Sequence, residues 1–269
     1  MGRPPPKPAP SRTRREPPRF RTVVVRGLEA RGPRLTRVTL GGSELAGLTI
    51  DQPAASVRLL LPAQARQLVM PTWNGNEFLL PDGSRPPIRT FTPRRFDPDA
   101  LELDIEIVRH GAGAASEWVA AAQPEDAAAI SGPGRGYAVD DDAPAFLLAG
   151  DETAIPAISQ LLEVLPREPP VDVHIEVSHP EGRLDLPDHP HAAVTWHDLP
   201  PGAPPGDALV DAVRGVDLVP GSRVWVAGEA AAVQRIRRHL FEDRGLPRAS
   251  TTVRGYWKRG ARGDGGDDA

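Results

Sequence analysis

Hydrophobic and polar residues alternate position by position in the first half of the chain. The clearest example covers residues 101–108, where four aliphatic residues alternate with three acidic ones. A strict period of two predicts a β-strand with one face buried and the other in water. Turns rich in Gly, Pro and Asp separate such runs, a pattern typical of an antiparallel barrel or sandwich. The predicted strands cover residues 20–28, 34–40, 56–61, 88–93, 101–108 and 127–130.

The pattern changes after three consecutive aspartates at residues 140–142. Short apolar runs then alternate with helical segments of about 10–15 residues, which predicts a parallel sheet covered on both faces. We therefore expect a β-barrel domain over residues 19–142 and an α/β domain over residues 143–262. One short helix, over residues 114–122 with Ser116 as its N-cap, interrupts the first domain. In the second domain the predicted strands are 146–149, 171–177, 193–196 and 223–227, and the predicted helices are 154–165, 208–213 and 230–244.

The composition narrows the functional classes. None of the 269 residues is cysteine, which excludes disulfides, thiolate metal ligands, iron–sulfur clusters and thiol catalysis. A net charge of −4 gives no general attraction to nucleic acid or to an anionic membrane. No apolar run approaches the roughly 20 residues of a membrane-spanning helix. We therefore expect a cytoplasmic, monomeric protein with no nucleic-acid partner and no membrane insertion.

The two ends of the chain differ from the rest. Residues 1–18 are rich in Pro and Arg and hold too little apolar surface to offset the entropy of ordering, so they are predicted to form a disordered basic tail. Residues 263–269 are predicted to form a disordered acidic tail.

The stretch FLLAGDET at residues 146–153 joins a predicted strand to a predicted helix. Gly150 stands at the carboxyl end of the strand, where ligands bind in open α/β sheets, yet the glycine-rich G-x-G-x-x-G loop is missing. Asp151 and Glu152 are poorly suited to a phosphate, because a helix N-terminus attracts the same charge that they carry. They fit better as an N-cap and a first-turn acid. The stretch is either an ordinary strand–helix corner or a dinucleotide site of another kind.

The stretch RTFTPR at residues 89–94 carries a second candidate site. In a strand, Arg89 and Phe91 face one way, and Thr90 and Thr92 face the other. A flavin needs such a set, because it requires a cation for its pyrophosphate, a flat apolar contact and a hydrogen-bonding group near the reactive ring edge. The alternative is an edge strand with a solvated arginine.

The stretch HGAGAASEW at residues 110–118 is a candidate anion site. Small residues precede the predicted helix start, and Ser116 together with the first backbone N–H groups can hold a phosphate. The alternative is a flexible glycine turn capped by serine.

Four histidines fall close together in and after a proline-rich loop, but their spacing does not match a metal-ligand motif, so no metal site is expected and they are interpreted as solvated loop residues. These histidines are His179, His189, His191 and His197. The chain also has no G-x-S-x-G motif, so a serine hydrolase is not supported.

The stretch GYWKRG at residues 255–260 places two aromatic residues beside two cations near the end of the chain. It is either a hydrophobic tail that docks onto the α/β domain or an aromatic lid with a basic rim over a flat cofactor.

Together these segments resemble the siderophore-interacting protein family, whose members are flavin-dependent ferric-siderophore reductases of the ferredoxin–NADP reductase-like superfamily. They occur in the family's order over residues 20–262, and GDETAIPAI and GYWKRG are the most specific. The resemblance implies a six-stranded antiparallel FAD-binding β-barrel followed by a Rossmann-like NAD(P)H domain. The matching segments are RTFT (89–92), HGAGAASEW (110–118), GPGRG (132–136), GDETAIPAI (150–158), VTW (194–196), GEAAAVQRIRRHL (228–240) and GYWKRG (255–260).

The resemblance also implies the residues of the site, with the flavin held by the RTFT strand and the 110–116 loop and the nicotinamide side formed around Gly150. Phe91 stands where the family usually has tyrosine, and Ala114 where proline is common; both departures bear on how tightly FAD is bound. The implied cofactor-binding residues are Arg89, Phe91, Thr92, His110, Gly111, Gly113, Ala115, Ser116, Gly150, Asp151, Thr153, Gly228, Glu229 and Trp257, and the implied substrate-binding residues are Arg58, Arg135 and Lys258.

The implied function is reduction of ferric siderophores with NADPH or NADH through FAD. Hard oxygen chelators hold Fe(II) far more weakly than Fe(III), so reduction releases the metal. The choice of coenzyme stays open, because Glu181 and Arg183 follow the strand at 171–177 and favour opposite readings of the ribose. Two alternatives remain: a flavin reductase of the same superfamily with another acceptor, and a non-enzymatic siderophore-binding module.

Overall fold

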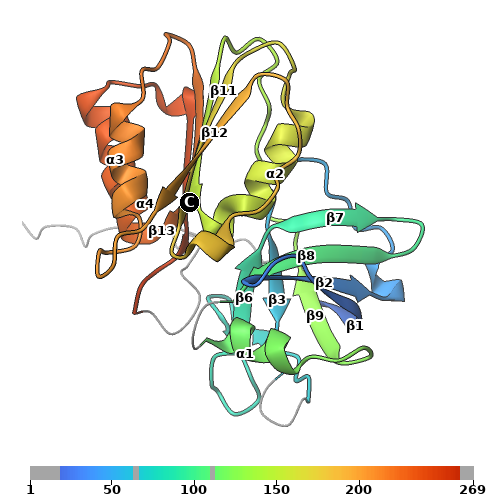
Figure 1. The fold of residues 1–269 in the computed structure, drawn as a ribbon. Coiled ribbons are helices and arrows are strands. Elements are labelled where there is room, and N and C mark those ends of the chain that lie inside the picture. The colour runs from blue at the N-terminus through green and yellow to red at the C-terminus, as the bar shows by residue number, and fades with distance from the viewer. Residues whose placement is uncertain (1–18, 63–66, 110–112, 261–269) are drawn as a thin grey trace, which may run out of the picture.

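The computed structural model describes residues 19–62, 67–109 and 113–260, which form two halves lying against each other (Figure 1). Both predicted tails, residues 1–18 and 263–269, lie outside these ranges. The first half contains β1 (Arg21–Ala30), β2 (Leu35–Gly41), β3 (Val57–Leu60), β4 (Thr72–Trp73), β5 (Phe78–Leu79), β6 (Ile88–Phe91), β7 (Pro93–Asp97), β8 (Glu102–Val108), α1 (Ala114–Ala121) and β9 (Ala127–Ser131). The second half contains β10 (Phe146–Asp151), α2 (Ile155–Val164), β11 (Val171–Val177), β12 (Ala192–Asp198), α3 (Asp207–Gly215), β13 (Arg223–Glu229), α4 (Ala230–Arg238) and β14 (Thr251–Trp257).

The first half is a curled antiparallel sheet in the order β6-β3-β9-β1-β2-β8-β7. Its two edge strands, β6 and β7, follow each other in the chain with only Thr92 between them, so the edges meet at this residue. The sheet has seven strands and not the expected six, because the predicted strand at 88–93 ends at Phe91 and a new strand starts at Pro93. A proline without an N–H is tolerated at the first position of a strand, and the β7–β8 register shifts just after it.

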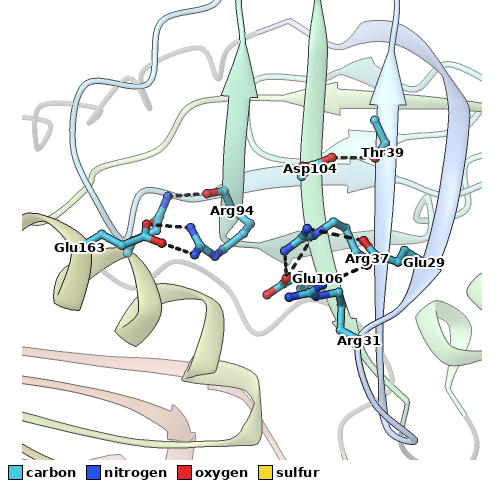
Figure 2. Close-up of polar contacts among 9 residues, drawn as sticks. Glu29, Arg31, Arg37, Thr39, Arg94, Asp104, Glu106 and Glu163 are labelled. Atoms are coloured by element: carbon cyan, nitrogen blue, oxygen red, sulfur yellow. Dashed lines mark hydrogen bonds and ion pairs between the residues drawn. The ribbon is translucent and has the colours of Figure 1, made fainter. Parts of the chain in front are cut away.

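The two faces of β8 separate as the sequence predicts, but the polar face is not in water throughout, since Glu106 on it is buried. Its aliphatic residues are buried in the barrel core, while its acidic residues pair with β2 on the other face. Arg37 donates to Glu106 (2.7 Å) and Thr39 donates to Asp104 (2.7 Å), as Figure 2 shows. These cross-strand pairs fix the register of β2 against β8.

The short helix α1 begins three residues earlier than a Ser116 cap would require. Gly113 is the N-cap, and Ser116 lies inside the first turn, where it is buried. The prediction of Ser116 as the N-cap was therefore wrong. Gly113 is in an extended conformation (φ 168°, ψ 143°), the non-helical backbone that an N-cap residue has.

The second half is an all-parallel sheet in the order β12-β11-β10-β13-β14. Alternate residues of β10 face opposite sides: Phe146 and Leu148 pack with α2, whereas Leu147 and Ala149 pack with α3 and α4. Figure 1 shows α2 on one side of the sheet and α3 and α4 on the other. The strand–helix alternation read from the sequence is confirmed in order and type.

Two differences from the expected elements lie near the C-terminus. The chain forms a further parallel strand, β14, where the sequence indicated only an aromatic tail or lid. The helix expected over residues 230–244 is an α-helix only to Arg238 and continues as a π-helical turn at His239–Asp243. Across the described ranges no helix is both long and apolar enough to cross a bilayer.

Candidate functional site

The carboxyl ends of the parallel strands face the barrel. The guanidinium of Arg34, between β1 and β2, donates to Glu152 after β10 (3.2 Å) and to Ser178 after β11 (2.9 Å). Tyr256 near the end of β14 is hydrogen-bonded to Thr92, where the edges of the barrel sheet meet. Ligands of open parallel sheets bind just outside this edge. The junction between the two halves is therefore the candidate site.

Asp151, the last residue of β10, is a buried carboxylate that accepts four hydrogen bonds. Its Oδ1 accepts from the backbone N–H and the hydroxyl of Thr153, so it is an N-cap as the sequence predicts. Its Oδ2 accepts from the backbone N–H of Glu229 (2.8 Å) and the indole N–H of Trp257 (2.7 Å). Burial raises the pKa of Asp151 above its usual value, and the bonds from these donors offset part of that rise. The carboxylate ties together the ends of three strands.

Two of the expected cofactor-binding residues are glycines because their neighbours leave no room for a side chain. A Cβ on Gly150 would collide with the Cβ of Ala154 and lie 3.0 Å from the carbonyl oxygen of Ala227. Gly228 has a positive φ of 153°, and a Cβ there would lie 2.7 Å from Oδ2 of Asp151. Both glycines allow the ends of β10 and β13 to approach the Asp151 carboxylate closely.

Glu229, the last residue of β13, holds the segment that follows β14. One carboxylate oxygen caps α4 by accepting from the backbone N–H groups of Ala231 and Ala232. The other accepts from the backbone N–H of Arg259 (3.1 Å). Trp257 and Arg259 are thus both bonded to carboxylates, and Lys258, which is exposed, stands between them. The lid role expected for Trp257 stays a prediction.

The expected flavin-binding strand is β6, at the edge of the barrel sheet. Arg89 lies opposite Leu59 and Phe91 lies opposite Val57, so both side chains share the face of the barrel core. The guanidinium of Arg89 donates to the carbonyl oxygen of Ile88 (2.7 Å). The structure therefore places the cation and the aromatic ring on one face, as the period of two predicts.

The expected pyrophosphate loop is only partly described. His110 and Gly111 lie outside the described residues, whereas Gly113, Ala115 and Ser116 form the cap and first turn of α1. The first N–H groups of a helix have no acceptor within the helix, which suits them to an anion.

The three expected substrate-binding cations lie on segments that the fold brings together. Arg58 of β3 is opposite Thr90 of β6 and Ser131 of β9 in the sheet. Arg135 is exposed in the loop after β9, which turns back so that the N–H of Gly134 donates to the carbonyl oxygen of Ser56. The carbonyl oxygen of Gly136 in the same loop accepts from Arg254 of β14. Lys258 directly follows the last residue of this strand, and the joint role of the three cations stays a prediction.

The histidines form no metal centre within the described residues, where no group of three or more His, Asp or Glu is arranged to hold an ion. His189 is buried and bonded to the carbonyl oxygen of Pro166, so its interpretation as a solvated loop residue was wrong. His197 pairs with His174 on the neighbouring strand.

Several residues of the junction were not expected as site residues. Arg34 and Ser178 carry no sequence motif, and their roles appear only when the two halves are packed together. Tyr256 lies within the aromatic pair noted in GYWKRG, and the hydroxyl of Thr92 in RTFT is its partner. A pairing of these two motifs was the one signal in the sequence that could have identified Tyr256.

The groups at the junction fit a flavin dinucleotide. On the barrel side stand a cation, an aromatic ring and a buried hydroxyl, contributed by Arg89, Phe91 and Thr92. The N-terminus of α1 follows β8, which contacts β6. The indole N–H of Trp118 in α1 is buried without a partner among the described residues. A cofactor with a flat ring and a pyrophosphate would use this donor set.

Comparison with known proteins matches both halves of the chain. Residues 24–137 match the family model for the siderophore-interacting FAD-binding domain, and residues 143–260 match the model for the siderophore-interacting protein. The ferric vibriobactin reductase ViuB of Vibrio cholerae is 31% identical over 84% of each chain. The NADPH-dependent ferric-chelate reductase of Escherichia coli is 29% identical over 89% of this chain and 93% of the relative.

Solved structures support the same assignment. The siderophore utilization protein from T. fusca superposes with a TM-score of 0.81 at 36% identity, covering 93% of this chain and 97% of that one. The ferredoxin reductase in carbazole 1,9a-dioxygenase has a TM-score of 0.65 at 14% identity, covering 88% of this chain and 68% of that one, and shares the fold alone.

Proposed function

This chain belongs to the siderophore-interacting protein family, and we propose that it reduces ferric siderophores with NAD(P)H and releases Fe(II). The observation that carries the proposal is the meeting of the two motifs at the junction, where Thr92 of the barrel bonds to Tyr256 of β14. This contact brings the expected flavin-binding strand to the edge of the sheet where a nicotinamide dinucleotide binds.

The side chains of the site bind and orient, and they supply neither a nucleophile nor an acid–base pair. Arg89 and the first turn of α1 would hold the two pyrophosphate charges, and Phe91 would cover part of the ring. Asp151 and Glu229 fix the backbone around the nicotinamide side. A flavin held by these residues would supply the redox chemistry, as acceptor of a hydride from NAD(P)H and donor of single electrons to ferric iron.

The substrate is held by electrostatic attraction to cationic side chains. Ferric siderophores are often anionic, and a cluster of cations beside the flavin raises both affinity and encounter rate. Arg58, Arg135 and Lys258 come from three segments of the chain, and Arg135 and Lys258 are exposed. We assign them to the chelate, with Lys258 as the principal contact because both of its neighbours are held by carboxylates.

The proposal is tested with the two half-reactions measured separately. The purified protein should carry FAD, and NADPH or NADH should bleach its flavin absorbance under anaerobic conditions. A ferric siderophore should then restore the absorbance, with two Fe(II) trapped by a ferrous chelator for each NAD(P)H consumed. Arg89→Ala provides a control that should contain little flavin and trap little iron.

The two alternatives give different results in the same experiment. Reoxidation by quinones or a protein acceptor, with none by ferric siderophores, would assign a flavin reductase with another acceptor. A colourless protein that binds ferric siderophores without reducing them would assign a binding module.

A further inference from the structure

Arg34 reaches from the barrel into the α/β half at a point to which no function has been assigned. It lies between β1 and β2, and its carbonyl oxygen accepts from the N–H of Arg109 at the end of β8. Its side chain crosses the junction and donates through Nη2 to Oε2 of Glu152 and Oγ of Ser178. These partners end the first and the second strand of the parallel sheet, β10 and β11.

Only one side of this guanidinium is used by the protein. The side chain is about a quarter exposed (25%), and its Nε is buried without a hydrogen-bond partner among the described residues. A buried donor without an acceptor is costly, and a guanidinium binds phosphate through two parallel N–H groups. Both hydrogen bonds to the α/β half use Nη2, so the exposed part of the guanidinium can still bind a phosphate.

Glu152 does not compete for a ligand at this place. Its Oε1 accepts from the backbone N–H and the hydroxyl of Ser178, both at 3.1 Å, and its Oε2 accepts from Arg34. The carboxylate is buried, and Gly182 packs so closely on it that a Cβ there would collide with Oε1. The acid therefore positions Arg34 and Ser178 and is itself shielded from a ribose.

The location is the one at which dinucleotide folds distinguish their two coenzymes. An acid at the end of the second strand binds the ribose 2′-hydroxyl of NADH, whereas an arginine nearby binds the 2′-phosphate of NADPH. Here the second strand, β11, is followed by Ser178 and not by an acid. Its own acid, Glu176, points to the other face and accepts from the N–H groups of Gly206 and Leu209 at the start of α3.

The two charged residues that left the coenzyme open in the sequence do not decide it. Arg183 donates to Asp198 at the end of β12 (2.6 Å), so its charge is already paired. Glu181 lies 3.6 Å from a ring nitrogen of His179 and is exposed. Arg34 is also paired, with Glu152, but its hydrogen bonds to Glu152 and Ser178 place its guanidinium at the end of β11.

We propose that Arg34, at the end of β11, binds the 2′-phosphate of NADPH and makes NADPH the preferred coenzyme. The inference rests on the proposed function only in taking a nicotinamide dinucleotide as the electron donor. The specificity determinant then comes from the barrel half, so coenzyme choice depends on correct packing of the two halves.

Calorimetric binding of two fragments tests the proposal without any acceptor. The parent protein should bind 2′,5′-ADP more tightly than 5′-AMP, which lacks only the 2′-phosphate. Arg34→Gln keeps an amide donor for Glu152 but removes the charge. It should weaken 2′,5′-ADP about tenfold or more, the loss of a charge-assisted hydrogen bond, and leave 5′-AMP unchanged. Arg34→Lys should retain most of the preference.

A second ion pair across the same junction supplies the matched control. Arg94 of β7 donates to Glu163 of α2, as Figure 2 shows, and is placed in no binding role. Arg94→Gln also removes one cation and one link between the halves, so a purely structural effect of Arg34 would be reproduced by it. The fragment preference should stay at the parent value in this variant.

Each other outcome overturns the proposal. Equal weakening of both fragments by Arg34→Gln would assign Arg34 to the pyrophosphate or to packing, and loss of FAD would assign it to the flavin. A parent protein that binds the fragments equally has no 2′-phosphate site.

If Arg34→Gln fails to fold, Ser178→Asp serves instead and should reverse the preference toward 5′-AMP and NADH, because it places an acid at the end of β11. Failure to reduce ferric siderophores would leave these binding results unaffected.

Discussion

At the scale of single residues, Lys258 is an exposed cation whose two neighbours in the chain are both held by hydrogen bonds. Trp257 bonds to Asp151 and the N–H of Arg259 bonds to Glu229, so the backbone on both sides of Lys258 is fixed while its ammonium group is exposed. A fixed backbone lowers the entropy lost when the side chain binds an anion.

Lys258→Ala should raise KM for an anionic ferric siderophore about threefold to tenfold at low ionic strength, because one cation beside the substrate is lost. The difference should shrink in high salt, where screening already weakens the attraction. FAD content and NAD(P)H oxidation with a neutral acceptor should be unchanged. Steady-state kinetics at two salt concentrations measure this.

Arg248→Ala is the control for net charge, because Arg248 is exposed near the start of β14, at the opposite end of this strand from Lys258. A KM increase of the same size in this variant would show a general charge effect, and Lys258 would then have no specific role in binding the siderophore.

At the scale of elements, a histidine pair links β12, the edge strand, to β11. His174 Nδ1 lies 2.9 Å from His197 Nε2 and the rings are stacked. Asp172 lies 3.2 Å from the other nitrogen of His174 without hydrogen-bond geometry. One imidazole must donate and the other accept, so protonation of both would place like charges in contact.

The pair should make stability depend on pH. Burial, followed by the charge of His174, lowers the pKa of His197 below its ordinary value of 6.5. A lowered histidine pKa contributes stability that is fully present above pH 6.5 and is lost as the pH falls through the folded-state value. The free energy of unfolding in urea should therefore fall below pH 6.5, and His197→Gln should reduce that slope. An unchanged slope in the variant would contradict this account.

At the scale of the whole molecule, the side-chain amide of Gln160 in α2 joins the two halves. Its oxygen accepts from the N–H of Ala54, and its nitrogen donates to the carbonyl oxygens of Pro93 (2.7 Å) and Arg94. Arg254 of β14 adds bonds to the carbonyl oxygens of Ala54 and Gly136. Backbone groups of the barrel are thus satisfied by side chains of the α/β half.

Gln160→Leu should destabilise the protein by about 1–3 kcal/mol, because it leaves partly buried backbone groups of the barrel without partners. Glu163→Gln, which weakens the more exposed ion pair with Arg94, should cost less than about 1 kcal/mol. Scanning calorimetry should show the larger loss and a broader or divided transition in Gln160→Leu. Equal effects of the two variants would contradict a role of Gln160 in joining the halves.

The sequence by itself determined most elements of both halves and the order in which they occur. The alternation in β8 and the apolar runs of β10, β11 and β13 record which side chains must leave water, and burial is a property of each position. The motif segments likewise identified the Asp151 cap and the family, and they predict a flavin-binding strand at β6. Strands without such a pattern were not found: β7 begins with a proline and two arginines, and β14 places polar residues among its aromatics.

Tertiary structure alone decided which of these segments meet. The bonds of Arg34 to Glu152 and Ser178 span 118 and 144 positions, and those of Trp257 to Asp151 span 106. A local pattern reports only that a side chain is polar, because its partner is selected by the packing of the two halves and by the direction in which each strand ends. The coenzyme site proposed for Arg34 follows from that packing, since neither the β1–β2 turn nor the end of β11 carries a signal of its own.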